Sequence, residues 1–175
     1  RYKQLSAHKT KSQRRRMCDF APITHTQGFK FFADSKGKLG WISPADTQTP
    51  ESITFEIPLA PLGLEEGSKN STTNSGFSHY RILVGYLRSY STVGKFSASM
   101  TPSSSSSAVI PTSSSLVVVD SHWERRQSTA EEIEVGSSMG PANLTITTMP
   151  SADGTNNNKV KILWVRAVGT TPTDS

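Results

Sequence analysis

Three side chains of types that bind metal ions stand at alternate positions of one short stretch, Asp120, His122 and Glu124 in DSHWE. If an extended strand continued through this stretch, the three side chains would project from one face, and carboxylate and imidazole groups are ligands of divalent transition metals. A strand that ends in a charged loop, beside Arg125 and Arg126, has the same composition. We favour this second interpretation and expect no metal site.

Nucleophilic catalysis is the next chemistry that the residue types suggest, because serine is abundant. The stretch GFSHY (76–80) does not match the G-x-S-x-G nucleophile elbow of hydrolases, because Tyr80 stands where that motif needs glycine. The sequence also contains no phosphate-binding loop, no dinucleotide fingerprint and no Cys/His zinc spacing. It therefore predicts neither an enzyme nor a cofactor.

A different chemistry is indicated by KTKSQRRRM (9–17), which has five cationic side chains in nine positions and no acid. Residues 1–16 carry +7 and the remaining 159 residues carry −2, so the whole-chain charge of +5 belongs to a cationic arm on a near-neutral body. This pattern is typical of an interaction tail for nucleic acid or an anionic membrane. A nuclear import signal and a solubilising tail are the alternatives. The predicted binding residues are Arg1, Lys3, Lys9, Lys11, Arg14, Arg15 and Arg16.

The chain behind this arm predicts an all-β fold. From Gly28 onward, short runs of β-branched and aromatic residues are separated by Gly, Pro, Ser, Thr and Asn about every ten residues, which is typical of a sandwich or barrel. In SITFEIPL (52–59) apolar and polar residues alternate, so one face is expected in the core. We predict an arm and lead-in over 1–27 and one β domain over 28–175. The expected strands are 29–32, 39–43, 52–59, 79–90, 95–100, 115–123, 131–137, 143–149 and 159–168.

Cysteine usage and hydropathy limit the setting of the protein. Cys18 is the only cysteine, so no disulfide within the chain is expected. The longest apolar clusters fall far short of the roughly 20 residues that cross a bilayer. We therefore expect a soluble, intracellular protein.

The aromatic residues are candidates for contacts with bases or with other subunits. Trp164 lies in the most apolar run and is expected in the core, whereas Trp123, among charges, is the better candidate for an interface anchor. Tyr80, Tyr86 and Tyr90, with Arg81 and Arg88 nearby, could form a base-stacking face. Core packing with polar tips is the commoner explanation, and we favour it.

Several stretches resemble the shell domain of coat proteins from small icosahedral positive-strand RNA viruses. SITFEIPLAPLG (52–63) is similar to a strand with a proline-containing exit, and SGFSHYRILVGYLRSYSTVGKFSASM (75–100) to an aromatic-rich strand entry, a turn and a further strand. KVKILWVRAV (159–168) resembles the closing strand, and a basic amino-terminal arm precedes the domain in this family. The matching residues are Pro58 and Pro61 at the exit, and Phe77, Tyr80, Arg81 and Ile82 at the entry.

This resemblance implies an eight-stranded antiparallel jelly-roll sandwich that assembles with copies of itself into a closed shell. It implies that the seven cations of residues 1–16 bind single-stranded genomic RNA, and that the protein is located in the virion and, during assembly, in the host cell cytoplasm, with a plant host expected and no membrane partner. Several similar coat proteins hold calcium between subunits, but SADGTNNN (151–158) lacks calcium-loop spacing, so we expect a polar turn at Asp153 and Gly154.

Two other interpretations remain open. One is a non-capsid single-strand nucleic-acid-binding protein, or a viral movement protein, with a β-sandwich body. The other is a cytoplasmic β-sandwich adaptor whose basic tail is a targeting signal.

Overall fold

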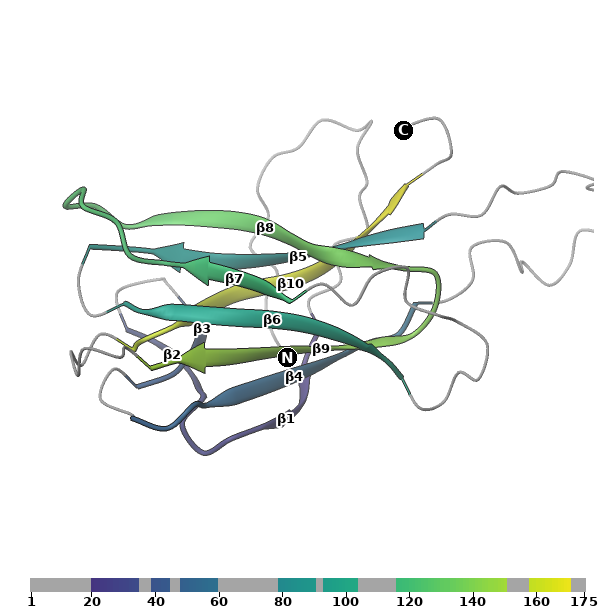
Figure 1. Cartoon of the computed structure of the whole chain (residues 1–175), viewed down its shortest axis with the longest axis horizontal. Helices are drawn as coiled ribbons and strands as arrows, with labels where there is room; N and C mark the ends of the chain where they lie inside the picture. Colours follow the sequence, from purple (N-terminus) through teal and green to yellow (C-terminus); the bar gives the residue numbers. More distant parts are fainter. Residues whose placement is uncertain are drawn as a thin grey trace, which may run out of the picture.

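The computed structural model describes residues 20–34, 39–44, 48–59, 79–90, 93–103, 116–150 and 158–170. Within these ranges ten strands form two five-stranded antiparallel sheets, and no helix is present (Figure 1). The predicted all-β fold is therefore confirmed. The strands are β1 (Pro22–His25), β2 (Lys30–Ala33), β3 (Leu39–Ile42), β4 (Ser52–Ile57), β5 (His79–Arg88), β6 (Lys95–Pro102), β7 (Val117–Asp120), β8 (Thr129–Ser138), β9 (Ala142–Met149) and β10 (Lys161–Thr170).

The sheets combine strands in a nested antiparallel pattern. The first sheet has the order β1-β4-β9-β6-β7 and the second has the order β2-β3-β10-β5-β8. Among the eight strands from β3 to β10 the pairs are nested: β3 pairs with β10, β4 with β9, β5 with β8 and β6 with β7. Successive nested pairs alternate between the two sheets. Within the first sheet the pairing of β9 with β6 joins two nested pairs, and within the second sheet the pairing of β10 with β5 does so.

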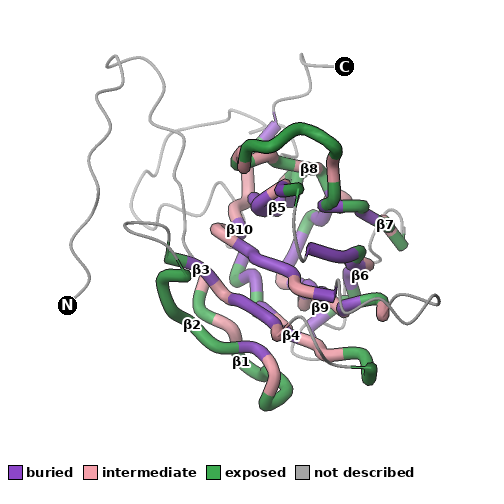
Figure 2. The backbone as a smooth tube through the Cα atoms, turned by 90° about the vertical axis from the view of Figure 1, so that its left-hand side faces the viewer, coloured by how far each residue is buried: buried purple, intermediate pink, exposed green. Residues whose placement is uncertain are grey.

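The core lies between the two sheets and is built from alternating side chains. In β4, Ile53, Phe55 and Ile57 are buried while Thr54 and Glu56 face outward, as the sequence alternation predicts. In β5, Ile82, Val84 and Tyr86 point into the same core. The ring of Tyr86 meets that of Phe96 from the opposite sheet edge to face, at 5.5 Å between centroids. Figure 2 shows this buried layer between the exposed outer strands.

The two amino-terminal strands were only partly predicted. β1 lies within the segment 1–27 that the sequence analysis treated as arm and lead-in, and it pairs with β4 through an irregular register. β2 pairs with β3. Each adds an edge strand to one sheet, so the described residues form ten strands where eight were expected. The expected strand 115–123 is shorter, since β7 ends at Asp120.

The prediction that Trp164 lies in the core is wrong. The register between β10 and β5 shifts between Ile162 and Trp164, so the alternation of inward and outward side chains changes there. Ile162 and Val165 are buried in the core, whereas Trp164 is half-buried on the outer face, where its ring covers Gly85. A residue larger than glycine at position 85 would overlap this ring.

Candidate RNA-contact and assembly surfaces

The seven predicted RNA-binding residues lie outside the described residues. Arg1, Lys3, Lys9, Lys11, Arg14, Arg15 and Arg16 all precede Phe20, where the described chain begins. Phe20 itself packs against the core and leads directly into β1. The calcium candidate 151–158 is described only at Asn158, so the expected turn at Asp153 and Gly154 also lies outside the described ranges.

The described body is nearly neutral, and most of its cations are already paired. It contains nine Lys and Arg and eight Asp and Glu, which leaves a charge of +1. Six of the nine cations form ion pairs with acids of the body. Lys30, Arg125 and Arg126 take part in no ion pair among the described residues, and they are spread over two regions of the chain. The described body therefore offers phosphate no dense cationic surface.

One charge network covers the outer face of β5, β8 and β10. Glu132 accepts a hydrogen bond from Trp164 Nε1 at 3.0 Å and pairs with Arg166. Arg81 and Glu134 pair beside it, with 2.5 Å between nitrogen and oxygen. Because opposite charges alternate across neighbouring strands, this face holds its charges without a net excess of either sign.

A second cluster surrounds Trp123 at the end of β5. The guanidinium carbons of Arg88 and Arg125 lie 5.4 and 5.7 Å from the indole centroid, and Trp123 Nε1 donates to the Gln127 carbonyl at 2.7 Å. Arg88 also pairs with Glu131 at 3.3 Å. Cation–π contacts of this kind fix the ring in place. Trp123 is half-buried in its own chain, so its predicted role as an interface anchor stays a prediction.

The three tyrosines do not form one base-stacking face. Tyr80 and Tyr86 pack on or in the core, whereas Tyr90 is 46% exposed. Tyr86 donates a hydrogen bond to Glu131 at 3.1 Å, so core packing with a polar tip is correct for this residue. Burial, and then the hydrogen bond and charge of Glu131, raise the pKa of the Tyr86 hydroxyl to about 12.

Asp120, His122 and Glu124 do not converge on a common point. β7 ends at Asp120, whose carboxylate accepts a hydrogen bond from the His122 backbone and pairs with Lys95. This agrees with the interpretation of a strand that ends in a charged loop. In the part of the chain that the structure describes, no three His, Cys, Asp or Glu side chains lie together in an arrangement that could hold a metal ion, and there is no helix that could span a membrane.

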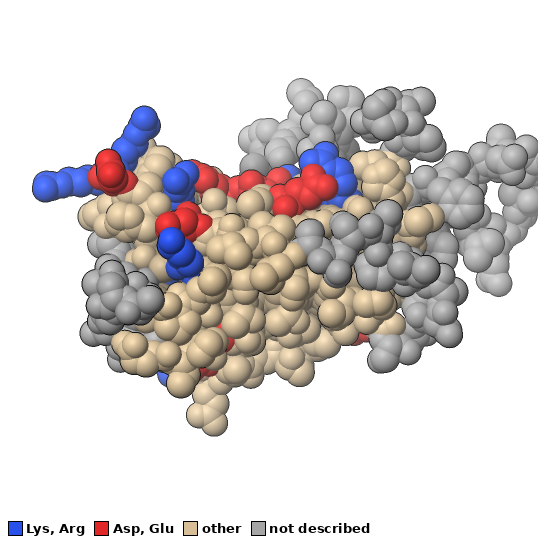
Figure 3. All heavy atoms as spheres, viewed as in Figure 1, with Lys and Arg blue, Asp and Glu red and all other residues tan. Residues whose placement is uncertain are grey.

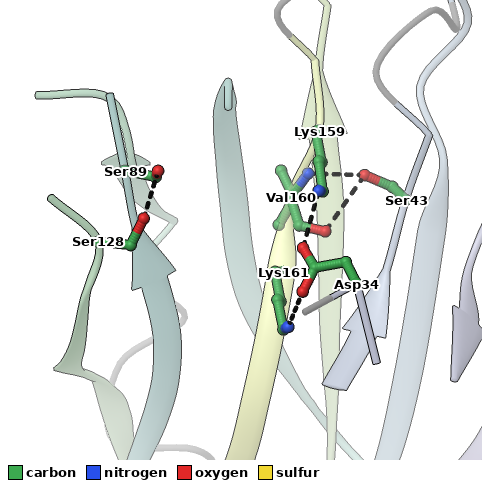
Figure 4. Close-up of polar contacts among 7 residues, drawn as sticks. All are labelled: Asp34, Ser43, Ser89, Ser128, Lys159, Val160 and Lys161. Atoms are coloured by element: carbon green, nitrogen blue, oxygen red, sulfur yellow. Dashed lines mark hydrogen bonds and ion pairs between the residues drawn. The ribbon is translucent and has the colours of Figure 1, made fainter. Parts of the chain in front are cut away.

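A buried ion-pair cluster, which sequence reasoning missed, ties β2 to β10 (Figure 4). Asp34, directly after β2, accepts hydrogen bonds from Lys161 Nζ at 2.5 Å and Lys159 Nζ at 2.8 Å. The Lys161 side chain is completely buried. Burial alone would raise the pKa of the Asp34 carboxyl, but the hydrogen bonds and charges of the two lysines outweigh it and hold the pKa below its ordinary value. The sequence signal was a pair of lysines on a strand otherwise predicted to be buried on both sides.

The outer face of the first sheet is rich in hydroxyl groups and carries little charge. Across β4 and β9, Ser52 and Thr147 hydroxyls lie 2.9 Å apart, and Thr54 and Thr145 hydroxyls 3.0 Å apart. Figure 3 views this face. Its middle is uncharged, and charged side chains gather along the rim where β8 runs and at the left end of the face, where β7 lies. A face with an uncharged middle can pack against another protein surface while desolvating few charges.

Exposed apolar side chains concentrate at the edges of the sandwich. On one side, where β1 and β2 lie, Ile23, Phe31, Phe32 and Leu39 are between 43% and 52% exposed. On the other side, Leu116 and Val118 at β7 are 66% and 51% exposed. These six residues are candidates for contacts with another protein surface.

Comparison with protein families and with curated proteins gave no relative. No protein-family model matches the chain, and a search of curated proteins found no match. The function proposed below therefore depends on the sequence and the geometry.

Proposed function

We propose that this protein is the coat protein of a small icosahedral RNA virus, with a jelly-roll body and an RNA-binding arm. The observation that carries the proposal is the nested pairing of β3 with β10, β4 with β9, β5 with β8 and β6 with β7, in alternate sheets. A long antiparallel hairpin rolled into two sheets has this order, and it is the order expected of an eight-stranded jelly roll. In this view β1 and β2 are additions at the edges. Viral capsid domains are a major use of that architecture.

The division of charge separates this proposal from other uses of such a body. Seven cations and no acid lie in residues 1–16, whereas the described body carries +1 with most of its cations paired. A near-neutral body can pack beside copies of itself without strong repulsion, while the arm neutralises phosphate. In this proposal the body forms the shell and residues 1–16 contact RNA.

RNA binding by such an arm is independent of base sequence. Sixteen extended residues reach up to about 50 Å, enough to follow a packaged strand. If all seven cations contact single-stranded RNA, the logarithm of the binding constant falls with the logarithm of salt concentration with a slope of about −5. The proposed locations are the virion and, during assembly, the cytoplasm of a host cell, with a plant as the expected host.

The test is sedimentation of natively extracted protein, with absorbance at 260 and 280 nm and negative-stain imaging of the fastest fraction. The proposal expects closed particles rich in absorbance at 260 nm. Removal of residues 1–16 is expected to abolish most RNA uptake and to leave the circular dichroism of the β body unchanged. A slow monomer without nucleic acid would contradict the proposal.

A matched pair of variants separates the arm from the body. Arg14, Arg15 and Arg16 are changed together to Gln in one variant, and Lys30, Arg125 and Arg126 in the other. Each variant loses three positive charges. We expect the first to reduce the magnitude of the salt slope by about 2 and the second to leave it unchanged. Equal losses would place the RNA contacts on the body as well.

Equal losses in the two variants would favour a protein that coats single-stranded nucleic acid without forming a shell, such as a movement protein. The indole of Trp123, flanked by Arg88 and Arg125, is the described feature that supports this alternative, since aromatic rings beside cations bind bases in single-strand binders. Under this alternative, removal of the arm weakens RNA binding only in part and no closed particle forms.

A further inference from the structure

The edge strand β2 is exposed along its whole length although two of its four residues are phenylalanines, which are usually buried. All four residues of KFFA are exposed, including Phe31 and Phe32 at 43% and 44%. Within the described residues β2 pairs only with β3, so its other side is a sheet edge. Phe31 and Phe32 project from opposite faces of β2, and the centroid of the Phe31 ring lies 5.3 Å from that of Trp41, so Phe32 is the apolar side chain that β2 exposes on its outward face.

The strand β7 is a comparable edge on the opposite side of the sandwich. It has the sequence VVVD and, within the described ranges, pairs only with β6. Val118 and Asp120 face outward, while Val119 is buried. Figure 2 shows β2 and β7 on opposite sides of the molecule. One copy can therefore present β2 to a neighbour and β7 to another at the same time.

The two strands match when they are aligned antiparallel. Lys30 then stands opposite Asp120, Phe32 opposite Val118 and Ala33 opposite Val117. Residues directly opposite each other in an antiparallel pair share a face. Phe32 and Val118 are both outward and similarly exposed, at 44% and 51%.

The charges at the ends of the two strands are also complementary. Lys30 takes part in no ion pair among the described residues. Within the same residues Asp120 pairs with one cation, the exposed Lys95 at 3.3 Å, and its carboxylate also accepts a hydrogen bond from the His122 backbone. Opposite charges at this position favour the antiparallel alignment over its reverse, in which Lys30 would meet Val117.

We propose that β2 of one copy of this chain docks antiparallel beside β7 of a second copy, with Phe32 against Val118 and Lys30 beside Asp120. The contact is heterologous, because it joins different surfaces of identical chains, so repeated contacts close a ring when the rotation permits. Phe32 and Val118 supply the apolar centre of an interface, and a stable interface buries about 800 Å² on each partner. In the shell this contact joins neighbouring subunits, and in that respect it rests on the proposed coat-protein function.

The test uses full-length chains with Cys18→Ser, which removes the native thiol. One chain carries Phe32→Cys and the other Val118→Cys. Opposed side chains of an antiparallel pair have Cβ atoms about 4.5–5.5 Å apart, close to disulfide distance. We expect the mixture to form a cross-linked dimer under mild oxidation, at a rate at least about ten times that of either chain alone.

The matched control replaces Val118→Cys by Met139→Cys. Met139 is 43% exposed and lies in the turn between β8 and β9, outside the proposed contact. Cross-linking of Phe32→Cys to this control as fast as to Val118→Cys would overturn the proposal. So would rapid cross-linking of Phe32→Cys to itself, which would mean a two-fold symmetric contact through β2.

A second measurement does not depend on disulfide geometry. Phe32→Ser, and separately Val118→Ser, are expected to raise the dissociation constant between copies at least about tenfold. In a heterologous contact each variant keeps one intact surface, so a mixture of the two forms dimers that do not extend. Unchanged association of both variants would overturn the proposal.

Failure of this contact and failure of the shell are distinguishable. Closed RNA-containing particles that do not cross-link at positions 32 and 118 would refute the contact and leave the coat-protein function in place. Cross-linked rings or chains without RNA and without closed particles would support the contact and contradict the shell.

Discussion

The ion-pair cluster of Asp34, Lys159 and Lys161 gives the sharpest test of the structure, through the substitution Asp34→Ala. The side chains of Asp34, Lys159 and Lys161 are 17%, 25% and 0% exposed, and both lysines donate to the one carboxylate. Removing one partner of a buried pair costs about 3–5 kcal/mol, and here both lysine charges lose the Asp34 carboxylate, with the Lys161 side chain fully buried. We expect the free energy of unfolding to fall by this amount.

The assay is urea unfolding of the full-length chain, followed by tryptophan fluorescence. Asp120→Ala is the matched control. It removes the aspartate of an exposed ion pair, in which the Lys95 and Asp120 side chains are 58% and 50% exposed. Exposed pairs contribute at most about 1 kcal/mol. The reasoning would be refuted if Asp34→Ala lowered the free energy of unfolding no more than Asp120→Ala does. It would also be refuted if the double variant Asp34→Ala, Lys161→Met lost as much stability as the two single variants together, because the effects of coupled residues are not additive.

The pH dependence supplies a second readout. The pKa of Asp34 is lowered in the folded chain, so its stabilising contribution is present above the unfolded pKa of about 3.9 and is lost as the pH falls through the folded value. The difference in stability between the wild-type chain and Asp34→Ala should therefore narrow in acid. A difference that stays constant below pH 4 would contradict the assigned role of the carboxylate.

Three further substitutions test other parts of the fold by the same unfolding assay. Gly85→Ala should cost about 1–3 kcal/mol and alter the fluorescence of Trp164, because the added methyl group overlaps the indole ring; an unchanged spectrum would contradict this packing. Ser43→Ala should cost about 1–3 kcal/mol, since the buried Val160 N–H donates to the Ser43 hydroxyl at 2.8 Å; a smaller loss would mean that this N–H finds another acceptor. Tyr86→Phe should cost about 1 kcal/mol and remove a tyrosine ionisation near pH 12 from an alkaline titration. The Tyr86 contribution is full below pH of about 10 and is lost as the pH rises towards 12, so a variant with the wild-type titration would refute the assignment.

The central strands could be predicted from the sequence because one face of each is buried and the other is not. The alternation in SITFEIPL fixes which side chains of β4 enter the core, and β9 follows the same rule with Leu144 and Ile146. The two amino-terminal edge strands, β1 and β2, give no such signal. β2 is exposed at every position and β1 pairs through an irregular register, so pattern alone identified the first only as a short run and missed the second.

Two side chains show why other parts could not be predicted. Trp164 belongs to an alternating apolar run, but a register shift in the pairing with β5 moves it to the outer face, where the absence of a side chain at Gly85 leaves room for the ring. The charge of the buried Lys161 is paired with Asp34, which is more than a hundred residues earlier in the chain and directly follows β2. Both outcomes depend on pairing between distant strands, and a local pattern holds no information about such pairing.

The pairing of charges within the body explains how one chain can combine the two proposed tasks. The six paired cations of the body are held by its own acids, so they add little to the long-range attraction of phosphate. The attraction is then concentrated in residues 1–16, which carry +7. The surfaces proposed for contact between copies are mainly apolar or rich in hydroxyl groups, and salt weakens such contacts far less than it weakens contacts with phosphate. The proposed RNA binding and the proposed subunit contact would therefore respond to different physical variables, and this separation would let a shell exchange its RNA contacts without dissolving the contacts between its subunits.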